Sequence, residues 1–468
     1  MADRPHNQQR QQPQQPDGKP AYALFTIVVL GAAAGSLSQT AVSAMLGDIM
    51  SEYGMEVDLG QWLTTSYMLV LGVTVPVVTF LTRRLSVRRH ILLAMGVFLA
   101  GALVDFLAPN FALMLAGRVL QAASAGMLLP LMQTIAMTRF PKNHQATAMG
   151  VGGIALGFAP NIGPTVGGAM SYAWGWRSFF VLLIVWAAAL IVATIAVVRP
   201  AEPADPGARL DVFSLALSTL GFGGVLLGFS NASSSALTSP FIWVPLAVGA
   251  LFLTWFVVRQ RRVDRPLISM DIFRSRRYVH GFVVQNLLYA SFMGVTLVIP
   301  LYVEGLCGGT SMQAGMVLLP GTAMALIFNP LAGVLADRVG IRPVAVGGGA
   351  FLATGAVLMS FIDAETPLYL VMAFQGVRAV GTSSLIGPLT TWSLPELRGP
   401  TVADGSAFAT AVRQACASFG TSAMVFIITL VGATALGAAN PALAYQAAFG
   451  FSAVCAIALF VLSVVWVR

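Results

Sequence analysis

Long apolar stretches, separated by short polar or basic ones, follow one another from about residue 21 to the end of the chain. Each stretch is about 20 residues long, which is the length that an α-helix needs to cross a bilayer. We therefore expect an all-α integral membrane protein, since a membrane β-barrel would show short alternating segments instead. About fourteen such segments are expected, at residues 22–47, 60–82, 91–108, 111–138, 146–170, 178–198, 212–232, 240–258, 280–302, 312–336, 343–362, 367–393, 405–432 and 443–467.

The stretch before the first apolar segment, residues 1–20, is rich in Gln, Pro and Asn. Such a composition cannot bury a core, so we interpret it as a disordered cytoplasmic tail. It does not resemble a signal peptide, because the polar stretch is long and the apolar run behind it continues to about residue 47.

The composition agrees with a membrane protein, because 57% of the 468 residues are hydrophobic and only 9% are charged. Soluble domains carry about 25% charged residues. The three cysteines show no CxxC spacing, and the four histidines fall in the tail or at predicted loop edges. We therefore expect no metal, no disulfide and no cofactor.

The net charge of +8 is distributed in a way that predicts topology. If both termini are cytoplasmic, 22 of the 26 Lys and Arg residues lie in the tail or in cytoplasmic loops, and one, Arg177, lies outside. This imbalance follows the positive-inside rule and supports an even number of spans. The basic excess thus predicts contact with anionic lipids and argues against a nucleic-acid partner.

Two parts of the chain repeat each other. FLTRRLSVRR after the second segment resembles GVLADRVGIRP after the tenth at an offset of 254, and Arg118 and Arg378 stand 260 apart in similar surroundings. The same order and nearly the same spacing indicate two parallel halves, as in many transporters. We expect six-helix bundles at 21–200 and 280–468, with an inserted helix pair and a basic cytoplasmic linker at 201–279.

The remaining three arginines, Arg118, Arg378 and Arg413, fall within predicted helices. Arg118 lies about two turns inside an otherwise apolar segment, LMLAGRVLQAASAGMLLPLMQT. A charge at that depth is costly and usually faces a partner or a pathway, although an arginine can also snorkel to the interface. Arg378 and Arg413 are candidates to attract anionic headgroups or anionic parts of a substrate, or to bond to backbone carbonyls.

Among the 18 carboxylates, Asp105 alone lies inside a predicted helix, about one turn from the outer end of the third segment. Hairpin geometry puts Asp105 and Arg118 in the outer third of adjacent helices. We expect them to form an ion pair that keeps both ionised until protonation of Asp105 frees the arginine. The alternative is a static structural ion pair.

Several stretches together resemble the major facilitator superfamily, in its fourteen-helix drug:proton antiporter branch, and within it the lincomycin-resistance exporters of Gram-positive bacteria. They are QWLTTSYMLV, GRVLQAASAGMLLPLMQT, GFAPNIGPTVGG, WRSFF, STLGFGGVLLGFS and GVLADRVG, and the resemblance runs from about Tyr22 to the C-terminus. It implies a monomeric, multi-pass protein of the bacterial plasma membrane that is not an enzyme. It also implies export of hydrophobic or amphipathic small molecules, such as lincosamides and dyes, by alternating access and proton antiport.

The loop motif of the family, G-x-L-x-D-R-x-G, is intact in the second half, where it contains Asp337 and Arg338. A carboxylate near a helix end can pair with arginines or with a neighbouring helix N-terminus, and we expect such a contact to act in gating. The first-half copy has Arg83 in place of the aspartate, so a carboxylate contact is not expected there. The L-D-x-T pattern of the first helix also departs from the family, because Ser38 replaces the acid.

The fifth segment carries GFAPNIGPTVGG, which matches the antiporter motif of the family. Its prolines remove backbone donors and permit a kink, and its glycines leave a groove for a facing helix. The resemblance implies a role in export, whereas a purely structural kink is the alternative. The motif residues are Gly157, Pro160, Gly163, Pro164, Gly167 and Gly168.

A substrate cavity is expected between the halves, with an apolar and aromatic wall and a few neutral polar groups that suit bulky amphipathic compounds. Ordinary helix packing is the alternative for each candidate. The candidates are Ser38, Gln39, Trp62, Tyr67, Gln133, Asn161, Gln285, Asn286, Tyr289, Phe292 and Phe408.

Other functions remain open to different degrees. A lipid or lysolipid flippase of the same fold, with a laterally open cavity, is the main alternative, and a homologue that senses without transporting is another. A membrane enzyme or an ATP-driven pump is not supported, since the chain has no HExxH, no GxxxxGK[ST] and no pair of membrane carboxylates. A channel is disfavoured, because two halves with interrupted helices suit alternating access.

Overall fold

The computed structural model describes residues 22–55, 57–200, 211–232, 239–263, 266–397 and 400–467. The predicted tail and part of the predicted linker lie outside these residues. Every regular element in the described ranges is helical. The elements are α1 (Tyr22–Tyr53), α2 (Val57–Gly60), α3 (Trp62–Arg84), α4 (Val87–Leu107), α5 (Phe111–Arg139), η1 (Lys142–His144), α6 (Gln145–Gly153), η2 (Ile154–Phe158), α7 (Ala159–Trp174), α8 (Arg177–Val197), α9 (Val212–Asn231), α10 (Pro240–Gln260), η3 (Met270–Arg274), α11 (Arg276–Leu301), η4 (Tyr302–Leu306), α12 (Ser311–Val339), α13 (Ile341–Met359), α14 (Leu368–Ser393), α15 (Pro400–Gly432), α16 (Ala435–Ala439) and α17 (Ala442–Trp466).

Each predicted apolar segment overlaps a long helix, and the fifth segment corresponds to α6, η2 and α7 in succession. Within the described ranges, 11 helices are long and apolar enough to cross a membrane, or 12 if the bent helix α3 counts as one span. The chain is therefore a multi-pass, all-helical protein. The count of fourteen spans stays a prediction.

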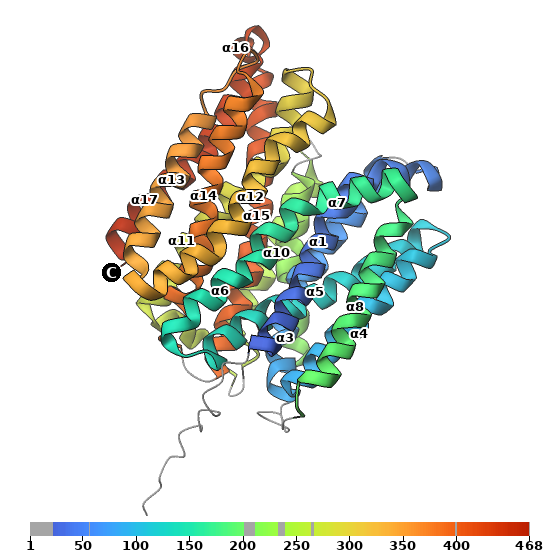
Figure 1. Ribbon diagram of the computed structural model, residues 1–468, viewed down its shortest axis with the longest axis vertical. Coiled ribbons are helices and arrows are strands. Elements are labelled where there is room, and N and C mark those ends of the chain that lie inside the picture. The colour runs from blue at the N-terminus through green and yellow to red at the C-terminus, as the bar shows by residue number, and fades with distance from the viewer. Residues whose placement is uncertain are drawn as a thin grey trace, which may run out of the picture.

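The long helices form two bundles that stand side by side (Figure 1). The first consists of α1, α3 to α8 and η2, and the second of α11 to α15 and α17. The bundles meet mainly where α6 packs on α12 and α14, and where α15 packs on α3 and α5. The inserted helices α9 and α10 pack chiefly on each other, and α9 also contacts α3 and α15, one helix of each bundle.

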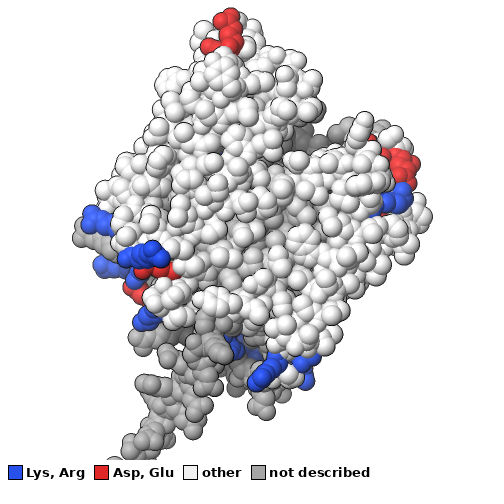
Figure 2. Space-filling view, in the orientation of Figure 1, with Lys and Arg blue, Asp and Glu red and all other residues white. Residues whose placement is uncertain are grey.

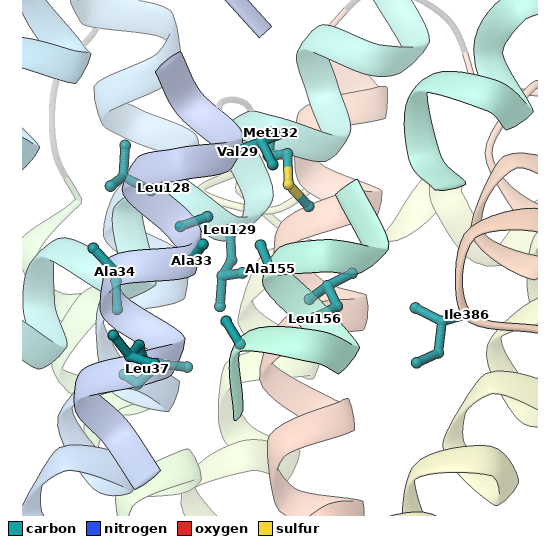
Figure 3. Packing of buried hydrophobic residues seen from close by; sticks show 14 of the residues in the cluster. Val29, Ala33, Ala34, Leu37, Leu128, Leu129, Met132, Ala155, Leu156 and Ile386 are labelled. Atoms are coloured by element: carbon teal, nitrogen blue, oxygen red, sulfur yellow. The ribbon is translucent and has the colours of Figure 1, made fainter. Parts of the chain in front are cut away.

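The first bundle is built around α1, whose buried residues are largely small. Figure 3 shows Val29, Ala33 and Leu37 of α1 beside Leu129 of α5 and Ala155 of η2. Small residues let helix backbones approach closely, and close packing is what holds helices together where lipid removes the hydrophobic driving force. This packing fixes the part of the fifth segment that faces the other bundle.

Two glycines of the fifth segment are needed for its contact with α1. A methyl group at Gly163 would lie 3.0 Å from the carbonyl oxygen of Leu37, and one at Gly167 would lie 2.7 Å from that of Ala41. At Gly168 the nearest atom, Cβ of Ala44, would be 3.8 Å away, which is an ordinary contact. The predicted groove therefore depends on Gly163 and Gly167 and not on Gly168.

The fifth segment contains a π-helical stretch, η2, which ends two residues before Pro160, where the sequence predicts a kink. A proline removes one donor and clashes with the carbonyl four residues earlier, and a π-bulge relieves this by widening the helix locally. The side-chain amide of Asn161 donates to the carbonyl oxygen of Gly157 at 2.8 Å inside this stretch. The pieces α6, η2 and α7 thus follow one another without a break.

Charged residues concentrate at the two ends of the molecule, and Figure 2 shows blue cations mainly along the left edge and the bottom of the view. This basic end comprises the turns α3–α4, α5–α6 and α12–α13 and the linker 266–275, which carry Arg83, Arg139, Arg338 and Arg274 among others. At the opposite end Arg177 forms an ion pair with Glu52 at 2.5 Å. The asymmetry agrees with the charge placement expected from the sequence.

Candidate functional site

Arg118 of α5 is fully buried inside the first bundle. Its Nη1 donates to Ser38 Oγ at 2.6 Å and to Gln121 Oε1 at 2.9 Å, and its Nε donates to the carbonyl oxygen of Leu63 at 3.3 Å. The guanidinium lies 4.2 Å from the ring centroid of Tyr67, whose hydroxyl donates to the carbonyl oxygen of Gly35. Arg118 therefore does not snorkel, and it joins α1, α3 and α5.

The expected ion pair between Asp105 and Arg118 is not formed, which corrects that prediction. No ion pair within 4.0 Å connects them in the described ranges, and neither carboxyl oxygen of the fully buried Asp105 has a hydrogen-bond partner. The physical reason is that neutral acceptors hold Nε and Nη1 of Arg118, whose Nη2 has no hydrogen-bond partner, while the Asp105 carboxyl packs against Gly117, the residue before Arg118. Asp105 is thus adjacent to Arg118 without being its partner.

Arg378 of α14 is buried in the second bundle and lines a small cavity between the bundles. Its Nε donates to Gln375 Oε1 at 2.9 Å, whereas Nη1 and Nη2 have no partner. The guanidinium lies 5.9 Å from the ring centroid of Phe292. The lining residues, from both bundles, are Gly157, Asn161, Phe292, Gly321, Ala325, Gln375, Arg378, Ala379, Thr382, Ser383 and Ile386.

Arg413 of α15 connects the bundles near this cavity. Its Nη2 donates to Thr410 Oγ1 at 2.9 Å. With the Gln133 amide oriented so that its oxygen faces the guanidinium, that oxygen accepts from Nη1 at 3.1 Å and from Nη2 at 2.9 Å. Gln133 belongs to α5 of the first bundle, and the Arg413 guanidinium also lies 5.1 Å from the ring centroid of Tyr289.

Asp337 connects the two bundles at one side of the basic end. It lies on α12 and binds the start of α6. Its carboxylate accepts from the backbone N–H of Ala146 at 3.1 Å and of Thr147 at 2.7 Å, and from the Thr147 hydroxyl at 2.6 Å. A helix N-terminus presents free N–H groups and a partial positive charge, so a carboxylate binds it favourably. Of the two partners expected for this acid, the helix N-terminus is the one observed, while the adjacent Arg338 is exposed.

Arg83 and Asp404 connect the two bundles at the other side of the basic end. Arg83 lies on α3 and Asp404 on α15. Arg83 Nη2 donates to Oδ1 and Oδ2 of the buried Asp404 at 2.8 and 2.7 Å. The same carboxylate accepts from the backbone N–H of Ser269 in the linker at 3.0 Å. The first-half loop motif therefore makes an inter-bundle contact of its own, which its departure from the family pattern did not lead us to expect.

The remaining cavity candidates divide into three groups. Asn161 and Phe292 line the cavity, and Gln133 and Tyr289 lie beside it through Arg413. Ser38 and Tyr67 instead hold Arg118 within the first bundle. The others lie apart from this cavity: Gln285 and Asn286 bond within the second bundle, Phe408 packs with aromatic residues at the basic end, Trp62 is exposed near the opposite end, and Gln39 is half-buried on α1.

The sequence reasoning missed the residues that hold the charged groups in place. Gln121 and Gln375 each lie three positions from a buried arginine and bond to it, and Asp404, which binds Arg83, stands one residue before the predicted segment 405–432. A signal for the glutamines existed, because each lies within helical contact distance of its arginine. Nothing local pointed to Asp404, since its partner is 321 residues away.

The arrangement can perform two tasks. Contacts at the basic end hold the two bundles together through Asp337 and through the pair of Arg83 and Asp404. Farther from that end, side chains of both bundles surround a cavity that contains a buried cation. No group of three or more His, Cys, Asp or Glu residues in the described ranges could hold a metal ion.

Comparison with known proteins gives one consistent family. The family model described as Major Facilitator Superfamily matches residues 28–421. An uncharacterized MFS-type transporter of Bacillus subtilis is 32% identical over 93% of each chain. The lincomycin resistance protein of Listeria monocytogenes is 29% identical over 84% of each chain, and a multidrug resistance protein B homolog of Mycobacterium tuberculosis is 27% identical over 86% of this chain and 75% of its own.

Solved structures share the same fold. The human organic anion transporter MFSD10 superimposes with a TM-score of 0.66 at 14% identity, covering 95% of this chain and 100% of that one. The proton:xylose symporter XylE superimposes with a TM-score of 0.62 at 14% identity, covering 93% and 94%. At this level of identity the similarity concerns the architecture.

Proposed function

The chain belongs to the major facilitator superfamily, and from this premise we propose that it is a secondary active exporter of hydrophobic and amphipathic small molecules. It works by alternating access and belongs to the fourteen-helix drug:proton antiporter branch. Similarity to lincomycin and multidrug resistance proteins supports this choice of substrates. Lincosamide-like antibiotics and dyes are the compounds to test first.

The observation that carries the proposal is a pair of inter-bundle contacts at one end together with a cavity between the bundles. Asp337 binds the start of α6, and Arg83 binds Asp404 of α15, so two different helix pairs close the same end. If both contacts break while the opposite end closes, a molecule in the cavity passes from one side to the other. The close packing of η2 and α7 on α1 gives the antiporter motif a rigid surface in such a movement.

We place the basic end in the cytoplasm of a bacterial cell, with both termini inside and fourteen spans through the plasma membrane. The positive-inside rule supports this orientation, because nearly all loop cations lie at that end. The inserted pair α9 and α10 then completes an even number of crossings. The exporter acts as a monomer in contact with anionic lipids.

Proton coupling is assigned to Asp105. An ionised carboxylate is costly where it is buried and has no partner, so this conformation favours its protonated form. A conformation that releases Arg118 from Ser38 and Gln121 would allow its guanidinium to pair with Asp105 and favour loss of the proton. The acid that many family members carry in the first helix is Ser38 here, and Ser38 binds Arg118 instead.

The test is efflux of a dye and of a lincosamide from cells that express the chain, with and without a protonophore. Asp105→Asn and Arg118→Ala are compared with the parent, and Glu304→Gln, which alters an exposed carboxylate, serves as the control. Export that the protonophore abolishes and that both variants lose supports the proposal. Export that persists in Asp105→Asn contradicts the coupling role, and absence of export from correctly inserted parent protein contradicts the exporter.

A further inference from the structure

Three arginines are buried among the described helices, and none of them has a carboxylate partner. Arg118, Arg378 and Arg413 bond instead to the neutral amides of Gln121, Gln375 and Gln133. A buried cation is normally paired with an anion or supplied with enough acceptors, because the loss of hydration is costly. Apart from Asp105, which lies next to Arg118 without bonding to it, the groups that these arginines contact supply no opposite charge.

Arg378 is the buried arginine that lines a cavity, and in this conformation the cavity has room for about one water molecule. It is 1% exposed, its Nη1 and Nη2 have no partner, and it lines the inter-bundle cavity. Only Nε is occupied, by Gln375. The two free nitrogens form one edge of the planar fork that arginine uses to bind carboxylate, sulfonate or phosphate oxygens.

The rest of the lining suits the apolar part of such a ligand. Ala325, Ile386 and Phe292 provide apolar surface, and the hydroxyls of Thr382 and Ser383 lie on the same helix as Arg378. The lining includes no carboxylate that would compete for the guanidinium. Both bundles line the cavity, because Gly157 and Asn161 of the first bundle form its other wall.

A second cation lies on the far side of the aromatic pair. The ring of Tyr289 contacts that of Phe292 at a centroid distance of 6.5 Å, and the Arg413 guanidinium lies over Tyr289. Arg413 is held by Thr410 and Gln133, both of them neutral. The aromatic pair thus has a guanidinium at each end, and the field at the cavity is positive from two directions.

We propose that this cavity, once the bundles have moved apart in the export cycle, binds the anionic head of an amphipathic molecule. A carboxylate, sulfonate or phosphate would be held on the Nη1 and Nη2 edge of Arg378, with the apolar part of the molecule along Phe292 and Ile386. The proposal rests on the proposed export function and narrows its substrate class from amphipathic compounds in general to amphipathic anions. The same headgroup chemistry is offered by a free organic anion and by an anionic phospholipid.

The test is equilibrium binding of radiolabelled laurate to the purified full chain in phosphatidylcholine nanodiscs, with empty nanodiscs subtracted. Dodecyltrimethylammonium, which has the same chain length and the opposite charge, is the matched probe. Arg378→Gln is expected to weaken laurate binding by about tenfold or more, since charge-assisted hydrogen bonds are lost. Arg378→Lys keeps the charge without the fork and should weaken it less, and Arg342→Gln, at an exposed arginine, should leave it unchanged.

The outcomes separate clearly. Saturable laurate binding that exceeds binding of the cation and depends on Arg378 supports the proposal. Displacement of laurate by added phosphatidylglycerol identifies a lipid headgroup as the occupant, and lack of displacement identifies a free amphipathic anion. The proposal is overturned if the parent protein binds laurate no more tightly than dodecyltrimethylammonium, a comparison that needs no variant. It is also overturned if Arg378→Gln binds laurate as tightly as the parent does.

Dye efflux from proteoliposomes of the same preparation distinguishes this inference from the proposed function. Efflux without preferential laurate binding leaves the exporter standing and removes the anion site. Laurate binding without efflux removes the exporter and leaves the anion site.

Discussion

Arg83 and Asp404 form an ion pair across 321 residues of sequence, in which Nη2 of Arg83 donates to both carboxylate oxygens, at 2.8 and 2.7 Å. Arg83 occupies the position that Asp337 has in the second half, at the repeat offset of 254. In the second half the loop motif supplies the carboxylate and the partner helix supplies its N-terminus. In the first half the loop motif supplies the cation, Arg83, and the carboxylate belongs to Asp404 in the first turns of α15.

Because Arg83 supplies the positive charge and Asp404 the negative one, inverting the charge of only one of them should disrupt their contact. Arg83→Asp and Asp404→Arg should each destabilise the closed basic end by about 2–5 kcal/mol, because each leaves like charges in a partly buried site. The double variant should recover part of the loss, though not the bond from Ser269 to Asp404. Thermal unfolding and dye efflux of the four proteins measure this, and unaffected single variants would contradict it.

The contact of Asp337 with α6 should depend on charge. Asp337→Asn keeps the shape of the side chain but weakens its interaction with the helix N-terminus, at a cost of about 0.3–2 kcal/mol. We expect slower efflux and greater labelling of cysteines introduced along the α6–α12 interface from the cytoplasmic side. Asp271→Asn is the matched control, since it removes an exposed carboxylate at the same end. Identical labelling of Asp337→Asn and the control would refute a gating role.

Neighbouring glycines of the antiporter motif should differ in their tolerance of a methyl group. Gly167→Ala would place Cβ 2.7 Å from the carbonyl oxygen of Ala41, so α1 and α7 must separate. Overpacking of this kind destabilises by about 1–3 kcal/mol. Gly168→Ala meets its nearest atom at 3.8 Å and should unfold at the parent temperature. Equal melting temperatures for the two variants in detergent would show that the α1–α7 contact is not tight.

The first turn of α9 should lose local stability at acidic pH. Burial acts to raise the pKa of the Asp211 carboxyl, but hydrogen bonds from Ser214 and the guanidinium of Arg259 outweigh it and hold the pKa below its ordinary value of 3.8. A lowered pKa means that the stabilisation is present above pH 3.8 and is lost as the pH falls through the folded-state value.

Asp211→Asn tests this directly. At neutral pH the variant should lose about 1 kcal/mol of local stability, because the ion pair with Arg259 and the negative charge at the helix N-terminus are lost. The ratio of amide exchange rates between variant and parent in the first turn of α9 should therefore exceed one at pH 7 and approach one as the pH falls below 3.8 and through the folded-state pKa. A ratio that does not change with pH would contradict the assignment.

Periodicity, composition and charge placement were sufficient to predict the helical architecture. Each apolar run overlaps a long helix because a segment in lipid must satisfy its backbone internally, so length and hydropathy alone determine where helices form. Most loop cations in the described ranges lie at one end because topology is decided by charge beside the spans. Burial of Arg118 and Arg378 was also predictable, since both stand deep inside otherwise apolar segments.

Tertiary structure decided which charged groups meet. Asp105 and Arg118 are adjacent, as hairpin geometry predicted, yet the arginine donates its hydrogen bonds to Ser38 and Gln121. Which of several near neighbours binds a side chain depends on side-chain directions, and spacing in the sequence does not determine these. The contacts of Asp404 with Arg83 and of Asp337 with Thr147 bring together residues hundreds of positions apart, through the packing of one bundle on the other. Local sequence specifies where each helix lies in the chain, whereas partners across a bundle interface are selected by the geometry of the whole fold.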